Sequence, residues 1–186
     1  SRLRRACAAE GRPVKGLIGL AAAAIAALTA GGITAALPGT PTGDPSEGTA
    51  TQVRVTAVVD GDTLRVEDLA GRPLGRVRLL GIDAPEVAHP PAPAECYADQ
   101  ATGLLEDLVP VGSTVQIVAD SGQPDRDRYD RLLRYVDHDD VDVAHELLAR
   151  GTARRYEAAQ DLAREDSYSA AADDAQEAAS GLWGTC

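Results

Sequence analysis

Apolar and polar residues alternate along several short segments of the chain, a pattern typical of β-strands with one buried face. The alternation first runs through residues 53–59 (VRVTAVV) and resumes at 64–68 (LRVED), on either side of the turn sequence DGDT. Further apolar runs follow along the chain. The pattern predicts five strands, over residues 53–59, 64–68, 77–82, 113–119 and 131–137.

Other segments have the spacing of helices. Residues 98–109 repeat apolar side chains at helical intervals, and Pro110 ends the segment. Residues 143–150 predict a short helix, and residues 158–180 predict a longer one that is rich in alanine and acidic residues. Five strands with helices after the third and the fifth predict an α+β, mainly β fold, namely a small closed barrel of the OB type with three helices.

The first residues of the chain have a different character. Residues 1–15 are basic, and residues 16–37 form an uncharged apolar run, long enough for a bilayer, which takes about 20 residues. Basic residues before such a run keep the N-terminus in the cytoplasm, so we expect the rest of the chain to be exported. A cleaved signal peptide and a retained anchor helix both fit the run, and a buried core helix is the alternative.

Residues 38–50 are rich in Pro, Gly, Ser and Thr and predict a flexible linker. The folded domain is therefore expected over residues 51–186. If the chain is exported, this domain is extracellular, either secreted or tethered to the outer face of the cell membrane by the N-terminal helix.

Composition limits the core and the partners of this domain. Hydrophobic residues make up 44% of the chain, but there is no Phe or Met, so the core must consist mainly of Ala, Val, Leu and Ile. The formal net charge is −11, and after residue 50 the chain holds 13 arginines against 26 acidic residues. Such a charge excludes a diffuse basic footprint for nucleic acid, so a polyanion would need a local arginine cluster or a metal ion.

The two cysteines after the apolar run, Cys96 and Cys186, would lie in an oxidising compartment if the domain is exported. Two cysteines alone in such a domain indicate one disulfide, which would fix the C-terminal tail to the loop around Cys96. The alternative is a pair of unrelated free thiols.

Charged residues gather at the ends of the predicted strands. Asp62 lies in the first turn, Arg78 interrupts the third strand, Asp83 and Glu86 close it, and Arg131 opens the fifth. Carboxylates on adjacent strand ends can share a hard cation such as Ca²⁺, and arginine suits phosphate. A third carboxylate could act as a general base for water. Together these groups describe phosphodiester hydrolysis, although each alone also fits a hairpin turn, a proline-fixed strand exit or a solvated surface charge.

Five motifs occur in a characteristic order: VVDGDTLRV, RLLGIDAPE, ECYADQA, DRYDRLLRYV and GLWG. In this order and spacing the chain resembles the staphylococcal nuclease (thermonuclease) family from about Val53 to Trp183. The resemblance implies an OB-fold barrel with three helices. It also implies Ca²⁺-dependent hydrolysis of DNA and RNA, preferentially single-stranded, to 3′-phosphate products by a monomeric domain.

The resemblance assigns a role to individual residues. Asp62 and Asp83 match the two Ca²⁺-binding aspartates, and Ala84 falls where the family prototype binds the ion through a backbone carbonyl. Asp60 matches an acidic residue of the same turn that would support the ion's ligands. Glu86 matches the carboxylate that activates the attacking water.

The arginines follow the same pattern. Arg78 and Arg131 match the pair that grips the phosphate and stabilises the five-coordinate transition state, while Arg128 and Tyr129 match the groups that hold a terminal phosphate. Tyr156 is offset by about one position from the prototype's tyrosine pair. The pair Cys96 and Cys186, absent from the prototype, resembles that of exported family members.

A membrane-tethered structural or adhesion domain that only binds Ca²⁺ is one alternative function, but it would need the aspartates and not the two arginines. A non-catalytic OB-fold module that binds nucleic acid or another ligand is the other. Such modules lose the charged site residues, whereas this sequence keeps all five: Asp62, Arg78, Asp83, Glu86 and Arg131. The acidic stretch at residues 137–142 is expected to be a solvated turn rather than a second metal site.

Overall fold

The structure is a computed structural model that describes residues 48–186. The predicted basic segment 1–15, the apolar segment 16–37 and most of the linker 38–50 lie outside the described residues. Within 48–186, no helix is both long and apolar enough to cross a membrane.

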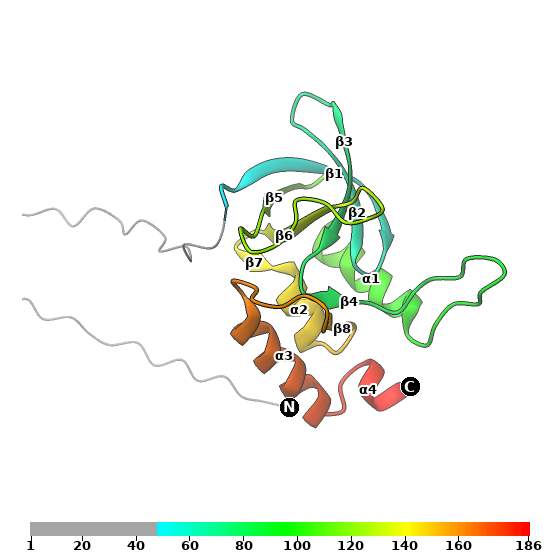
Figure 1. Ribbon diagram of the computed structural model, residues 1–186. Coiled ribbons are helices and arrows are strands. Elements are labelled where there is room, and N and C mark those ends of the chain that lie inside the picture. The colour runs from blue at the N-terminus through cyan, green and yellow to red at the C-terminus, as the bar shows by residue number, and fades with distance from the viewer. Residues whose placement is uncertain (1–47) are drawn as a thin grey trace, which may run out of the picture. The chain divides into compact units, whose positions relative to one another are not determined.

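Five strands close into a barrel at the top of the molecule in Figure 1. They pair in the cyclic order β1, β2, β3, β6, β5 and back to β1, all antiparallel except for the parallel pair of β3 and β6 that closes the barrel. This closed arrangement confirms the predicted OB-type barrel. The barrel strands are β1 (Thr51–Asp60), β2 (Thr63–Glu67), β3 (Pro73–Leu79), β5 (Thr114–Val118) and β6 (Leu132–His138).

The helices lie on one side of the barrel (Figure 1), where α1 packs on β1, α2 on β6 and α3 on α2. A separate two-stranded ladder joins β4 to β8 between the barrel and the helices, and β7 extends the sheet beside β6. The remaining elements are β4 (Ile82–Asp83), α1 (Ala98–Leu108), β7 (Val141–Asp142), α2 (Val143–Ala149), β8 (Arg154–Arg155), α3 (Glu165–Glu177) and α4 (Leu182–Thr185).

The core has the composition that the sequence requires. Aliphatic side chains on the inner faces of the strands, such as Val53, Leu64 and Val77, are fully buried. Tyr135 and Tyr168 are the largest buried side chains, and they meet edge to face with ring centroids 6.1 Å apart. This contact joins the barrel strand β6 to helix α3.

The prediction of one strand over residues 77–82 is wrong. The chain turns at Leu80 and Gly81, so β3 ends at Leu79 and a separate strand β4 begins at Ile82. Gly81 makes the turn possible because its φ is +78°, a left-handed conformation that other residues rarely adopt. This turn moves Asp83 out of the barrel wall and places β4 beside β8.

The predicted helix over residues 158–180 is shorter in the structure and begins at Glu165. Two tertiary hydrogen bonds hold the preceding segment as a loop. The backbone N–H of Ala163 donates to the Asp120 carboxylate at 2.9 Å, and the backbone carbonyl of Gln160 accepts from the Gln123 side chain at 2.7 Å. The short helix α4 after α3 was not predicted.

A disulfide joins Cys96, just before α1, to Cys186 after α4, with the Cα atoms 6.0 Å apart. The two cysteines are 90 positions apart in sequence. The bond therefore fixes the C-terminal segment beside the start of α1.

The Gly81 turn yields a stability prediction. A Cβ at this position would lie 2.8 Å from the buried Tyr168 ring and 2.9 Å from Leu162, in addition to the strain of the positive φ. We expect Gly81→Ala to lower the free energy of unfolding by about 2–4 kcal/mol in a denaturant titration. Gly71 is the matched control, since its φ is +82° but no atom lies within 4 Å of an added Cβ. Gly71→Ala should cost only about 1 kcal/mol, and equal losses would contradict the packing argument.

Candidate active site

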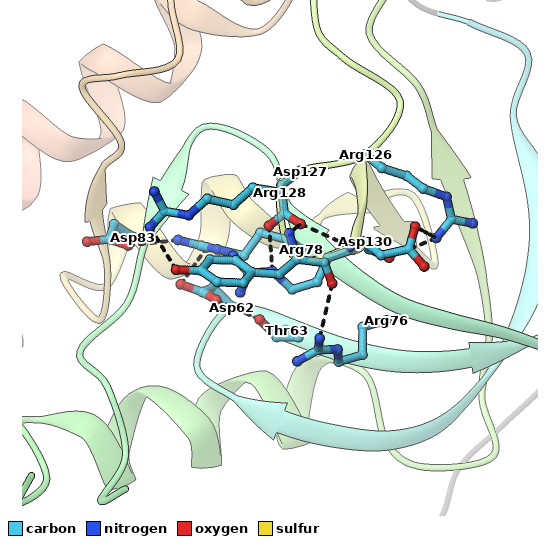
Figure 2. Close-up of polar contacts among 11 residues, drawn as sticks. Asp62, Thr63, Arg76, Arg78, Asp83, Arg126, Asp127, Arg128 and Asp130 are labelled. Atoms are coloured by element: carbon cyan, nitrogen blue, oxygen red, sulfur yellow. Dashed lines mark hydrogen bonds and ion pairs between the residues drawn. The ribbon is translucent and has the colours of Figure 1, made fainter.

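Three segments meet around the Arg78 side chain at one end of the barrel (Figure 2). The guanidinium of Arg78 is buried, with Nη1 2.5 Å from Asp62 Oδ2 and Nη2 2.7 Å from Asp83 Oδ1. Asp62 comes from the turn between β1 and β2, Arg78 from the end of β3, and Asp83 from β4. The positively charged Arg78 side chain thus links two carboxylates that lie on separate elements.

Asp62 is the buried member of this cluster. Besides its contact with Arg78, its carboxylate accepts hydrogen bonds from the backbone N–H of Ala84 and from the Thr63 hydroxyl, both at 2.9 Å. Burial raises the pKa of Asp62 to about 7; the Arg78 charge opposes this rise, and nearby Asp60 adds to it. Asp60 also accepts the backbone N–H of Asp62 at 3.1 Å, so it helps to shape the turn.

The loop before β6 supplies the second arginine. Arg131 Nε lies 2.6 Å from Asp127 Oδ2, while Asp127 Oδ1 accepts the backbone N–H groups of Tyr129 and Arg131. Partial burial tends to raise the pKa of Asp127. The hydrogen bonds from Arg131 and from the Tyr129 N–H outweigh this tendency, so the pKa lies below its usual value.

Tyr129 stands between two guanidinium groups on this loop. The central carbon of Arg128 lies 4.7 Å from the centroid of the tyrosine ring, and that of Arg131 lies 5.3 Å from it. Arg128 also donates to the Tyr129 hydroxyl at 2.7 Å. Tyr129 is 55% exposed, so the loop presents an aromatic side chain with two guanidinium groups close to it.

A cleft of about 600 Å³ brings most of these groups together. Asp62 and Ala84 are buried and do not line this cleft, and Asp60 is not among its lining residues either. The sequence-predicted residues that line it are Arg78, Asp83, Glu86, Arg128, Tyr129 and Arg131.

Glu86 differs from the other carboxylates of the site. It is exposed to the cleft, and its carboxylate has no hydrogen-bond or ion-pair partner among residues 48–186. Its backbone is held instead, since its N–H donates to the Glu95 carboxylate at 3.1 Å and its carbonyl accepts the Glu95 N–H at 2.9 Å. A fixed backbone with a free carboxylate leaves the side-chain oxygens open to water.

The donor set for a metal ion is small. Within the described part of the chain, no three His, Cys, Asp or Glu side chains gather in a metal-binding group. A cation at the predicted position would therefore rely on Asp62, Asp83, backbone carbonyls such as that of Ala84, and water.

Sequence reasoning missed one contributor to the site, Asp127, and left the role of another, Tyr156, open. Asp127 orients Arg131, and the acid–base spacing of four residues in DRYDR was the available signal. Tyr156 lines the cleft, with its ring centroid 5.9 Å from the Arg78 guanidinium carbon. Its backbone N–H donates to the Gly81 carbonyl, a contact that the sequence could not reveal because it depends on the β4–β8 ladder.

Comparison with known proteins identifies the family. A family model described as "Staphylococcal nuclease homologue" matches residues 76–185. The chain belongs to this family. The predicted family is thereby confirmed, and family members named as endonucleases confirm the predicted class of enzyme, a nuclease.

Three relatives illustrate the similarity. The uncharacterized protein MJ1439 of Methanocaldococcus jannaschii is 31% identical over 149 residues, or 70% of each chain. The SPbeta prophage-derived endonuclease YokF of Bacillus subtilis is 37% identical over 102 residues, covering 55% of this chain and 33% of YokF. Endonuclease YncB of the same organism is 35% identical over 102 residues, covering 55% of this chain and 46% of YncB. The chain thus matches less than half the length of either endonuclease.

The contact of Asp127 with Arg131 predicts a pH-dependent contribution to stability. Because the folded-state pKa of Asp127 is lowered, its contribution is fully present above the unfolded pKa of about 4 and decreases as the pH falls from there through the lowered folded-state pKa. We expect Asp127→Asn to lower the free energy of unfolding by about 1 kcal/mol near pH 7. The difference from the wild type should become smaller as the pH is lowered from 7 to 3. Denaturant titrations at both pH values test this, and a difference that is independent of pH would contradict it.

Proposed function

We propose that this protein is an exported, Ca²⁺-dependent nuclease that hydrolyses phosphodiester bonds of DNA and RNA, preferentially single-stranded, to 3′-phosphate products. The observation that supports this most directly is the cleft itself. It presents two arginines, Arg78 and Arg131, together with a carboxylate, Glu86, that has no partner among the described residues.

Arg78 and Arg131 would hold the phosphate. Each guanidinium is planar and permanently charged, which suits bidentate contact with two phosphate oxygens. Asp62 and Asp83 hold Arg78, and Asp127 holds Arg131, so both arginines are oriented before substrate enters. Fixed donors of this kind stabilise the extra negative charge of a five-coordinate phosphorus without reorganising during the reaction.

Glu86 would act as the general base. It takes a proton from a water molecule as the water oxygen attacks phosphorus, and the bond between phosphorus and the 5′ oxygen then breaks. The leaving oxygen takes up a proton from solvent in the open cleft, so that one water molecule is consumed in each cleavage. The products are a 3′-phosphate and a 5′-hydroxyl. Asp83 cannot serve as this base in the same way because it is paired with Arg78.

The residues present fit a Ca²⁺ ion. Calcium prefers hard oxygen ligands, and Asp62, Asp83 and the Ala84 carbonyl provide them. The rise in the pKa of Asp62 indicates that Arg78 alone does not offset the burial of this carboxylate, so a further positive charge would stabilise its ionised form. When bound, the ion would supply electrostatic stabilisation of the phosphate charge.

Export is part of the proposal. The apolar segment 16–37 after a basic stretch is typical of a signal peptide or an anchor. The disulfide between Cys96 and Cys186 suits an oxidising compartment. The nuclease domain would thus work as a monomer outside the cell, either secreted or tethered to the outer face of the membrane.

Replacing Glu86 tests the assignment of the base. Glu86→Gln keeps the size of the side chain but removes the proton acceptor, so we expect kcat on single-stranded DNA to fall by a factor of about 10² to 10⁴. Glu106 is a suitable control because it is exposed on α1 and does not line the cleft. Glu106→Gln should retain full activity. Undiminished turnover by Glu86→Gln would remove Glu86 from the mechanism.

Chelation tests the metal. We expect the purified full chain to cleave single-stranded DNA in the presence of Ca²⁺. Cleavage should stop when EDTA is added and recover when Ca²⁺ is returned in excess, because the ion bound by the two aspartates would stabilise the charge on the phosphate. EDTA already saturated with Ca²⁺ is the control for other effects of the chelator. Full activity in EDTA would refute the metal assignment. Binding of DNA without cleavage under any of these conditions would favour the non-catalytic OB-fold module.

A further inference from the structure

The arginines of the domain are not used uniformly. Nine of the 13 that follow residue 50 lie within ion-pair distance of a carboxylate. With two acidic residues for every arginine, pairing is the expected state. Among residues 48–186, four arginines have no carboxylate partner: Arg65, Arg76, Arg128 and Arg154.

Two of these four, Arg65 and Arg76, face each other across the β2–β3 hairpin. The strands are antiparallel and Arg65 is in register with Arg76, so their side chains project from the same face of the sheet. On its other side Arg65 is in register with Ala57 of β1. Both arginines are exposed. Like charges directly opposite one another destabilise a sheet, so this pair needs an explanation other than stability.

Within the described part of the chain, no carboxylate lies within ion-pair distance of Arg65 or Arg76 to relieve the repulsion. Glu67 is two positions beyond Arg65 on β2, but its carboxylate pairs with Arg54 at 3.0 Å. Arg76 uses one N–H group to donate to the backbone carbonyl of Tyr129 at 3.3 Å, a contact marked in Figure 2. Its other donors, and all those of Arg65, are left for solvent or a ligand.

Arg65 and Arg76 lie next to the candidate active site. Arg76 is two positions before Arg78 on β3, so both residues project from the same face of the strand, about 7 Å apart along it. Through Tyr129 it also contacts the loop that carries Arg128 and Arg131. The sequence Arg78, Arg76, Arg65 therefore forms a line that leads from the cleft across the outer face of β2 and β3.

We propose that Arg76 and Arg65 form a phosphate track, which binds the sugar–phosphate backbone of a single-stranded polynucleotide beyond the phosphate held at Arg78. An anion between the two guanidinium groups would cancel their repulsion, and the step from Arg78 to Arg76 is comparable with the spacing of successive phosphates in an extended strand. The inference rests on the proposed nuclease function. It adds that substrates long enough to reach the phosphate track bind more tightly, although these two arginines do not touch the reacting phosphate.

Salt dependence of binding tests the track without turnover. The full chain carrying Glu86→Gln, with Ca²⁺ present, is titrated with a fluorescently labelled single-stranded 12-mer of DNA at several salt concentrations. The logarithm of the binding constant falls linearly with the logarithm of the salt concentration, and each lost phosphate contact makes this negative slope shallower by about 0.7. Adding Arg65→Gln and Arg76→Gln should therefore make the slope shallower by about 1.4 and weaken binding about tenfold in 0.1 M salt.

A matched charge change separates local contact from overall charge. Arg150 is exposed at the end of α2 and does not line the cleft. In the same background, Arg76→Gln should weaken binding several times more than Arg150→Gln does. Equal effects of these two substitutions, or an unchanged slope in the double variant, would overturn the phosphate track. Because relief of the repulsion should leave the double variant at least as resistant to thermal unfolding as its parent, a fall in its melting temperature would also count against the interpretation.

Substrate length gives a second readout in the active enzyme. We expect Arg65→Gln with Arg76→Gln to reduce the ratio of kcat/KM for the 12-mer to that for a dinucleotide about tenfold, and an unchanged ratio would refute the track. Failure of the proposed function looks different. A chain that binds the 12-mer with the expected slopes but never cleaves it would leave the track standing and remove the nuclease. If the protein cleaves DNA but the double variant binds with an unchanged slope, the nuclease function stands and the phosphate track is refuted.

Discussion

The site depends on the burial of one carboxylate. Asp62 is removed from water, and a charge in that position must be paired and hydrogen-bonded to be tolerated. Its partners are the Thr63 hydroxyl, the backbone of Ala84 and the guanidinium of Arg78, which belong to the start of β2, the segment after β4 and the end of β3. The hydrogen bonds and the ion pair of this one buried carboxylate thus fix the relative positions of three elements.

The parts of the fold governed by local pattern could be predicted from the sequence. Alternation located four of the five barrel strands, and helical spacing located α1 and α2, all to within two residues. The split between β3 and β4 could not be predicted, because it depends on the packing of Tyr168 and Leu162 against Gly81 from distant parts of the chain. The late start of α3 depends in the same way on Asp120 and Gln123.

The charged residues show the same division. The motifs placed the arginines and carboxylates of the site near one another, but they could not show how each is held. The prediction of a solvated turn over the acidic stretch 137–142 is right only in part, because Asp139 and Asp140 alone among its aspartates are exposed in the turn between β6 and β7. Asp137 and Asp142 instead bind the guanidinium of Arg164 at 2.6 and 2.9 Å, and this arginine also stacks on Tyr135. Only the folded chain reveals which acidic residues stabilise its packing and which remain in solvent.

The parallel pairing of β3 with β6 has a consequence for the order in which the molecule is completed. This pair joins strands that are separated by β4, α1 and β5, and such non-local contacts are slow to form because a long loop must close first. Arg78 lies in the seam itself, in register with Leu133, and Arg131 directly precedes β6. In a chain whose barrel is still open, the two arginines of the proposed phosphate site are not yet brought together. Hydrolytic competence would therefore appear only with the final closure, so a nascent or partly unfolded chain would be harmless to the nucleic acids around it.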